Sequence, residues 1–187
     1  MADEWRPRTL STPRLILRAV DESDLGAIFA YASNPNVTRY TLFETHQSLD
    51  DTRAFLRDHV WPSYARQIPS PMGICLRDNP GWLIGTLGCS WNTLANKTME
   101  LGYALAEESW GRGIAAEAAR SLVDHLFATF PELVRVQAHC MAENAASARV
   151  MEKIGMSFEG RLRQATFRRG RSWDMLIYSV LRSERRL

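Results

Sequence analysis

The sequence contains few of the features that mark secreted, membrane-spanning or metal-binding proteins. Its three cysteines, Cys75, Cys89 and Cys140, are isolated and odd in number, with no C-x-x-C pair. This usage indicates a reducing, cytoplasmic setting and predicts neither a disulfide nor a zinc site. The N-terminus is acidic and has no apolar core segment, so we expect no signal peptide. No apolar run approaches the ~20 residues of a membrane span.

Charge and composition point to no particular macromolecular partner. The formal net charge is +2, which argues neither for nor against nucleic acid. The sequence has no internal repeats, low-complexity tracts or linkers. Hydrophobic residues make up 45% and charged residues 24% of the 187 residues, as in an ordinary globular protein. A chain of this length suits one core, so we expect a single domain over residues 1–187.

What the sequence does contain is one strongly patterned segment, from Met99 to Phe130. Apolar residues alternate with polar or small ones from Met99 to Ala106, which predicts a strand. After Trp110-Gly111-Arg112-Gly113 the period becomes helical, until Pro131 ends the helix. A strand that runs through glycines into a helix is a site for anions, because free backbone N–H groups and the positive end of the helix dipole converge there. We therefore expect a ligand that carries phosphates.

Two common phosphate-binding patterns fit this segment poorly. The Walker pattern is excluded, because no Gly-Lys-Ser/Thr follows at the required spacing. The dinucleotide fingerprint matches only as Gly111-x-Gly113-x-x-Ala116, and residues 133–138 are followed by His139 instead of an acidic residue. A simple turn before an amphipathic helix is a further interpretation.

The other periodic segments predict a mixed, mostly antiparallel sheet covered by helices. We expect strands at residues 12–18, 72–77, 82–91, 133–138, 158–167 and 172–181, and helices at residues 21–32, 48–60 and 144–155. Residues 78–81 predict one tight turn, and Arg169-Gly170 predicts the turn of a closing hairpin. The strand at 133–138 should run parallel to the central strand, because a long helix separates the two.

Three features each allow a functional and an ordinary interpretation. The loop at residues 38–47 either lines a substrate groove or merely connects two helices. His59, on the apolar side of its helix, is interpreted as a core or rim histidine in preference to a catalytic base. The arginines of the closing hairpin allow a nucleic-acid surface, but a solvated face that blocks edge pairing is favoured. These arginines are Arg161, Arg163, Arg168, Arg169 and Arg171.

Several motifs together resemble the GNAT N-acetyltransferases. Residues 101–105, L-G-Y-A-L, and 110–115, W-G-R-G-I-A, resemble the family's acetyl-CoA loop, Gln/Arg-x-x-Gly-x-Gly/Ala. Gly113 and Ala115 fill its last two positions, whereas Trp110 replaces the Gln or Arg. That replacement is shared by the branch of ribosomal-protein alanine N-terminal acetyltransferases. The opening T-P-R-L-x-L-R and the string from Glu143 to Gly155 also resemble this branch, so the similarity runs almost from end to end.

The resemblance implies an α/β GNAT fold that binds acetyl-CoA and needs no metal. Its sheet would have about six to seven strands and about four flanking helices, with a V-shaped cleft between the central strand and its parallel neighbour. The residues implied for the cofactor are Tyr103, Ala104, Leu105, Trp110, Gly111, Arg112, Gly113, Ile114, Ala115 and Asn144. The asparagine would contact the pantetheine arm.

The resemblance also implies the catalytic groups. Glu100, on the central strand, is expected to be the base. Ser147 is expected to protonate the leaving thiolate, because Met151 replaces the usual tyrosine and cannot donate a proton. A carboxylate that some members carry in the closing hairpin is replaced by Thr166.

The acceptor is expected to be a primary amine, and we favour the α-amine of a protein or peptide. An α-amine, with a pKa of about 7.7–8.0, loses its proton far more readily than lysine. A small amine, such as a polyamine or an aminoglycoside, and a non-catalytic acyl-CoA sensor are the alternatives. We expect no direct nucleic-acid or membrane partner, and a homodimer is among the assemblies left open.

Overall fold

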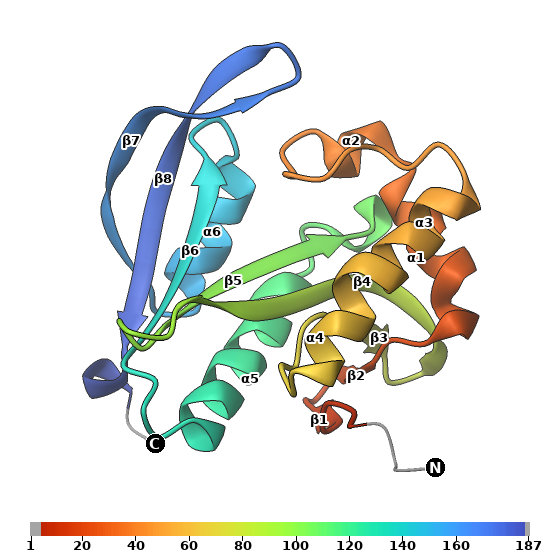
Figure 1. Ribbon diagram of the computed structural model, residues 1–187, viewed down its shortest axis with the longest axis horizontal. Coiled ribbons are helices and arrows are strands. Elements are labelled where there is room, and N and C mark those ends of the chain that lie inside the picture. Colours follow the sequence, from red (N-terminus) through yellow and green to blue (C-terminus); the bar gives the residue numbers. More distant parts are fainter. Residues whose placement is uncertain (1–4, 186–187) are drawn as a thin grey trace.

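The computed structural model describes residues 5–185, which form one twisted sheet with helices on both faces (Figure 1). The strand order is β1-β2-β3-β4-β5-β6-β8-β7. The strands are β1 (Leu10–Ser11), β2 (Leu15–Ala19), β3 (Met72–Leu76), β4 (Asn79–Thr93), β5 (Thr98–Leu105), β6 (Arg135–Met141), β7 (Ser157–Arg168) and β8 (Arg171–Leu181). Of the neighbouring pairs, β5 and β6 are parallel and the others are antiparallel. The predicted mixed sheet is confirmed, with the two-residue β1 as an unpredicted eighth strand.

Helices cover the two faces of this sheet and form two separate cores. The α-helices are α1 (Leu25–Ala32), α2 (Pro35–Thr38), α3 (Leu49–Phe55), α4 (Trp61–Ala65), α5 (Ile114–Thr129) and α6 (Ala145–Lys153). On one face, α5 and α6 pack against the sheet through residues such as Leu122 and Met151. On the other face, α1 packs through Ile28. Because side chains alternate along a strand, β5 supplies Leu101 to the first core and Ala104 to the second.

Capping groups lie at the helix ends that the sequence predicted. Asp21 and Ser48 each form a capping box at the start of a helical segment. Asn144 accepts a hydrogen bond from the backbone of Ser147 at 3.1 Å and so caps α6. Gly155, with φ of 87°, follows the C-terminal end of α6 in the left-handed conformation.

Two local predictions were wrong. The turn between β3 and β4 lies at residues 77–78, and Asn79 already pairs with Leu76, so Pro80 and Gly81 belong to β4. Register shifts in the adjoining ladder make room for this proline, which cannot donate to a regular ladder. His59 is exposed, because a π-helical turn at Leu56–Val60 rotates the helix between α3 and α4.

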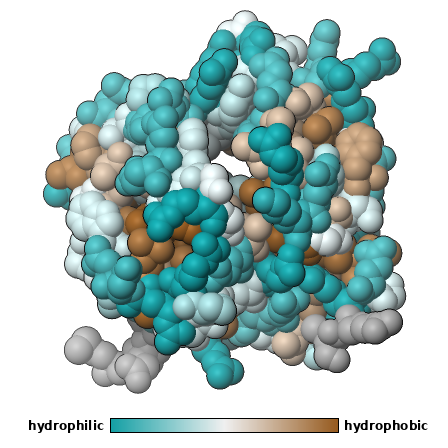
Figure 2. Space-filling model, turned by 180° about the vertical axis from the view of Figure 1, so that it is seen from behind, coloured by the Kyte–Doolittle hydropathy of each residue, from teal (hydrophilic) through white to brown (hydrophobic). Residues whose placement is uncertain are grey.

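The parallel pairing of β5 with β6 is short, and the sheet therefore opens between these two strands. β5 and β6 are paired only at Thr98–Arg135, Met99–Val136 and Glu100–Gln137. Beyond the last pair, β5 stays with β4 and β6 stays with β8, so the two halves of the sheet diverge. We call the resulting V-shaped gap the split, and the Glu100–Gln137 pair its vertex. The space-filling view from behind shows an opening near the middle of the molecule (Figure 2).

Candidate functional site

One wall of the split is the edge of β5 that faces away from β4. Ala106 donates its N–H to the carbonyl oxygen of Ile84 at 2.8 Å, on the β4 side. Because backbone groups alternate in direction along a strand, every second residue of β5 counted from Ala106 also faces β4. The residues between them face β6: Leu101 lies at the vertex, where the parallel pairing ends, and Tyr103 and Leu105 lie beyond it in the split. Ala104, which the resemblance assigned to the cofactor, pairs with Thr86 and turns its backbone away from the split.

The opposite wall is β6. Ala142 donates its N–H to the carbonyl oxygen of Asp174 at 2.9 Å, which fixes the residues that face β8. By the same alternation, the backbone of His139 faces the split. The two walls therefore offer a polar main-chain surface to any ligand that can pair with both strands.

The open end of the split leads to the start of α5. Gly111 and Gly113 have φ angles of 73° and 75°, a conformation that glycine adopts without strain. The first α5 backbone bond runs from the Glu117 N–H to the Gly113 carbonyl, and no side chain among residues 5–185 caps this end. The preceding N–H groups, including those of Ile114 and Ala115, thus have no partner within the helix. Such an end binds anions.

Two side chains fix this loop. Trp110 donates its indole N–H to the carbonyl oxygen of Leu105 at 2.7 Å, so it ties the loop to the end of β5. Arg14, from the start of β2, donates to the carbonyl oxygen of Arg112 at 2.9 Å and to Glu117 at 2.6 Å. No pattern in the sequence assigns Arg14 to this site, because only the fold brings the segment before β2 beside the glycines.

The vertex is a cluster of polar side chains around Glu100. The carboxylate accepts hydrogen bonds from Asn92 at 3.0 Å and Gln137 at 3.3 Å, and His139 lies 3.2 Å away through Nδ1. The hydrogen bond from His139 is the main reason that the pKa of Glu100 falls to about 2, against the opposing effect of burial. Glu100 is therefore ionised at neutral pH and is a weak base.

Ser147 and Tyr103 form a second polar pair in the split. The Tyr103 hydroxyl lies 2.7 Å from the Ser147 hydroxyl and 3.2 Å from the Ser147 carbonyl oxygen. Burial raises the pKa of Tyr103 to about 12, so this phenol keeps its proton. The resemblance implied Tyr103 for the cofactor, and the structure adds its hydroxyl to the site. The hydrogen bond also joins β5, which carries Tyr103, to α6, which carries Ser147.

The described residues 5–185 contain no cluster of three or more histidine, cysteine or acidic side chains that could hold a metal ion. All three cysteines are buried and unpaired. No helix within the same range is long and apolar enough to cross a membrane.

Known proteins share this arrangement. The model of the acetyltransferase (GNAT) domain matches residues 14–157. An uncharacterised N-acetyltransferase of Bacillus subtilis, YoaA, is 34% identical over 173 residues, which cover 92% of this chain and 96% of the relative. The chain belongs to the GNAT acetyltransferase family. It is an N-acetyltransferase, and the antiparallel neighbour of β5 excludes the dinucleotide-binding fold.

Two further relatives differ from each other in the acceptor that their names state. The ribosomal-protein-serine acetyltransferase of Escherichia coli is 32% identical over 133 residues, or 71% of this chain and 72% of the relative. The spermidine N(1)-acetyltransferase of Vibrio cholerae is 25% identical over 171 residues, or 91% and 95%. Among solved structures, a GNAT acetyltransferase from Bacillus anthracis has a TM-score of 0.83 at 27% identity, covering 95% of this chain and all of that one.

In this GNAT enzyme the loop at residues 39–47 is docked onto the tip of the β7–β8 hairpin. Arg169 donates to three of its carbonyl oxygens, and Arg168 forms an ion pair with Glu44 at 2.5 Å. Tyr40 packs edge-on against Trp173, with 6.1 Å between the ring centres. Tyr40 and Trp173 also join Met141, which lies on the same face of β6 as His139. Loop and hairpin thus border the face of the sheet on which Glu100 lies.

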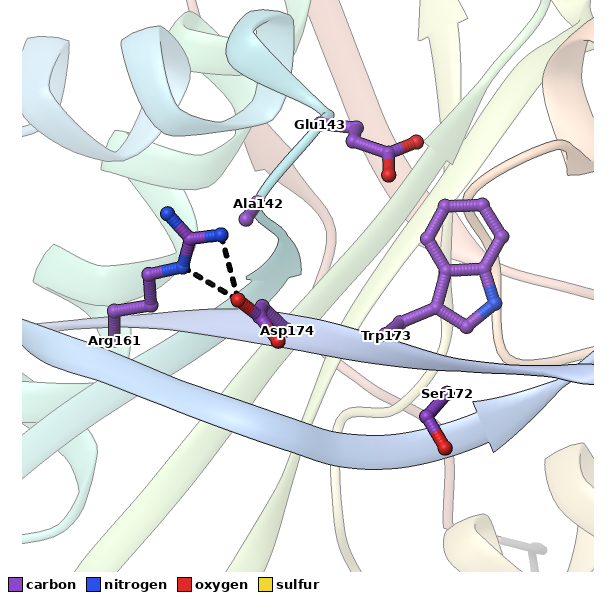
Figure 3. A pocket seen from close by; sticks show the side chains of 6 residues that line it. All are labelled: Ala142, Glu143, Arg161, Ser172, Trp173 and Asp174. Atoms are coloured by element: carbon purple, nitrogen blue, oxygen red, sulfur yellow. Dashed lines mark hydrogen bonds and ion pairs between the residues drawn. The ribbon is translucent and has the colours of Figure 1, made fainter.

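A hollow of about 210 Å³ opens beside this border (Figure 3). Its walls come from the end of β6, from β7 and from β8: Ala142, Glu143, Arg161, Ser172, Trp173 and Asp174. Arg161 is bound to Asp174 at 2.6 Å, and Glu143 pairs with Arg171 at 2.8 Å. Four of the five hairpin arginines are therefore held in ion pairs with acidic side chains, Arg168 and Arg169 both pairing with Glu44.

Proposed function

We propose that this protein transfers the acetyl group of acetyl-CoA to the α-amine of a protein or peptide. It would do so as a single domain over residues 1–187, in a reducing compartment such as the cytoplasm. One observation carries the proposal. The split connects an uncapped helix end, which suits a pyrophosphate, with a vertex that holds a carboxylate and an imidazole. The unpaired backbone between them suits an arm that contains amides, as pantetheine does.

The cofactor residues follow from this placement. Gly111, Arg112, Gly113, Ile114 and Ala115 would hold the pyrophosphate through backbone N–H groups and the Arg112 charge. The backbone of Tyr103 and the N–H of Leu105 would pair with the pantetheine arm, since the Leu105 carbonyl oxygen already accepts from Trp110. Trp110 would keep the loop in place, and Asn144 would offer its side-chain NH₂, because its oxygen already caps α6.

Acetyl transfer makes three demands on the chain, and the split has a group for each. The nucleophilic nitrogen must give up a proton, for which the Glu100–His139 pair is placed at the vertex. The tetrahedral oxyanion needs a fixed donor, which an N–H of β5 in the split would supply. The leaving thiolate must collect a proton, for which Ser147, backed by Tyr103, is the candidate.

The acidic side chains at the hairpin are paired with arginines, and this favours an α-amine over a polyamine as the acceptor. Glu44, Glu143 and Asp174, the acids at the hairpin, are each bound to an arginine. They offer few anchors to a polycation. At pH 7 roughly a tenth of an α-amine is neutral, against well under a thousandth of a lysine amine. A site with a weakly basic carboxylate suits the acceptor that needs less help in losing its proton.

A thiol-release assay with competing acceptors tests the proposal. Acetyl-CoA is supplied with equal concentrations of a free N-terminal peptide, an N-blocked lysine peptide and spermidine, and mass spectrometry locates the acetyl group. We expect acetylation of the α-nitrogen to predominate. Predominant lysine or spermidine modification would overturn the acceptor while keeping the acetyltransferase. CoA binding without thiol release for any amine would leave only an acyl-CoA sensor.

A further inference from the structure

His139 lies where the acceptor nitrogen would meet the thioester. It is the first residue of β6 past the vertex whose backbone faces the split, two positions after Gln137. Its side chain lies on the same face as Glu100, and the ring is 20% exposed. The histidine is therefore both tied to the vertex and open to a ligand on the acceptor side.

The contact with Glu100 determines which ring nitrogen of His139 can act. The carboxylate faces Nδ1 at 3.2 Å, and an ionised carboxylate can only accept a hydrogen bond. In the neutral imidazole the proton therefore resides on Nδ1, and Nε2 carries the free lone pair. Among the described residues, no side chain or backbone group is hydrogen-bonded to Nε2. The same division of roles operates when a buried carboxylate orients a catalytic histidine.

We propose that Nε2 of His139 is the general base of the acetyl transfer and that Glu100 is its positioning residue. This rests on the proposed function and assigns the proton acceptor within it. Glu100 itself is poorly suited to the task, because its pKa of about 2 lies far below that of any amine acceptor. Its role is to hold the Nδ1 proton and to stabilise the imidazolium that forms.

The acceptor enters as an ammonium, and His139 Nε2 takes one of its protons. The neutral nitrogen attacks the thioester carbon, the new C–N bond forms, and the nitrogen loses its second proton to water. The tetrahedral intermediate then breaks the C–S bond, and the thiolate receives a proton from the Ser147–Tyr103 pair. The imidazolium returns its proton to water, and the hydroxyl pair is reprotonated from water, so amide, free thiol and one net proton are released.

The charged side chain in contact with His139 is that of Glu100, and the other neighbours described below are apolar, neutral or paired elsewhere. From β8, the residue opposite is Ile177, which is apolar. Gln137 on β6 and Asn92, in the β4 bulge between Trp91 and Thr93, bind Glu100 and are neutral. Arg135, further along the same face of β6, is held by Glu159 at 2.5 Å. The charge that orients the His139 ring is therefore that of Glu100.

The test compares His139→Asn with the wild-type protein on two matched acceptors. Asparagine keeps a donor near the Nδ1 position but has no counterpart of Nε2. One acceptor is a peptide with a free α-amine, and the other is its aminooxyacetyl version, whose weakly basic nitrogen is already neutral at pH 7. His139→Asn should lower kcat on the α-amine peptide by roughly 10²–10⁴-fold, the usual contribution of a general base. On the aminooxy peptide the loss should stay below about tenfold, since little base catalysis is left to lose.

Controls separate this assignment from the function itself. His59→Asn, at an exposed histidine in the helical turn Leu56–Val60, should leave both rates unchanged. Calorimetry should show unchanged CoA affinity for His139→Asn. Equal losses on the two acceptors, or no loss, would overturn the role of His139. If His139→Asn does not fold, Glu100→Gln carries the same comparison, and equal losses there overturn the pair. Absence of thiol release from folded wild type on both peptides would instead refute the proposed function.

Discussion

The two ends of the split differ in the kind of polar group that they present, side chains at the vertex and backbone groups at the open end. At the vertex, side chains carry the polar groups, and Glu100 is surrounded by three of them from β4 and β6. At the open end, backbone groups do so, around two glycines with positive φ. A side chain presents a group that can change its protonation state, whereas a backbone N–H presents a fixed dipole. The difference indicates that chemistry is concentrated at the vertex and cofactor binding at the open end.

The comparison predicts that substitutions at the vertex reduce rate and those at the open end reduce affinity. Apart from His139, the largest effect is expected at Glu100. Glu100→Gln should lower kcat on the order of 10²-fold, because the charge that orients His139 is lost. Acetyl-CoA affinity, measured by calorimetry, should change little. Since the pKa of Glu100 is about 2, the carboxylate is ionised throughout the assay range, and the loss should be similar from pH 6 to pH 8. An unchanged rate at neutral pH would show that Glu100 is purely structural.

The open end should show the opposite pattern. Gly113→Val places a β-branched residue at a φ of 75° and should raise the acetyl-CoA Kd about 10- to 100-fold, as expected from the roughly 1–3 kcal/mol of such strain. The rate at saturating acetyl-CoA should be largely kept. Gly170→Val is the matched control for backbone strain, because Gly170 has a φ of 74° at the hairpin tip. An added Cβ would meet nothing within 4 Å there and only Arg14, at 3.6 Å, at Gly113. Normal CoA affinity in a folded Gly113→Val protein would contradict the assignment of this loop.

Between the two ends, the Ser147–Tyr103 pair should show a smaller effect. Ser147→Ala should slow transfer from acetyl-CoA only about tenfold, below the usual 10²–10⁴-fold, because the Tyr103 hydroxyl lies 2.7 Å away and keeps its proton. Adding Tyr103→Phe should increase the loss. With an acyl donor whose thiol is already acidic, both variants should approach the wild-type rate. If Ser147→Ala is equally slow with both donors, proton donation is not its role.

The smallest effect is expected behind the vertex, where Arg135 holds Glu159. The hydrogen bond from Arg135, with one from Ser179, lowers the pKa of Glu159 to about 2. The pair therefore stabilises the fold above the unfolded carboxyl pKa of about 4.3, and this contribution is lost as the pH falls toward 2. Because Glu159 is partly exposed, we expect less than about 1 kcal/mol. Urea unfolding of Glu159→Gln should show a shallower loss of stability between pH 5 and pH 3 than wild type, and an identical slope would contradict this.

Local patterns in the sequence were sufficient for most of the fold. Alternation along 99–106 placed Met99 and Leu101 in the core beneath α5, and the caps at Asp21, Ser48 and Asn144 marked real helix starts. These features depend on neighbours within a few residues, so they can be read without the fold. The two local errors, at Pro80 and His59, arose where a bulged ladder and a π-helical turn changed the expected period.

The sequence by itself determined the glycine turn, the helix behind it and the presence of Glu100 on the strand before it. Only the tertiary structure decided what surrounds them. Arg14 reaches the turn from 98 residues earlier to bind the Arg112 carbonyl, and His139 reaches Glu100 from 39 residues later. The hydroxyl of Tyr103 meets Ser147 across 44 residues. No local period encodes such contacts, because they depend on the divergence of β5 from β6 after three paired residues. That divergence follows from each strand keeping its antiparallel partner, which is a property of the whole sheet.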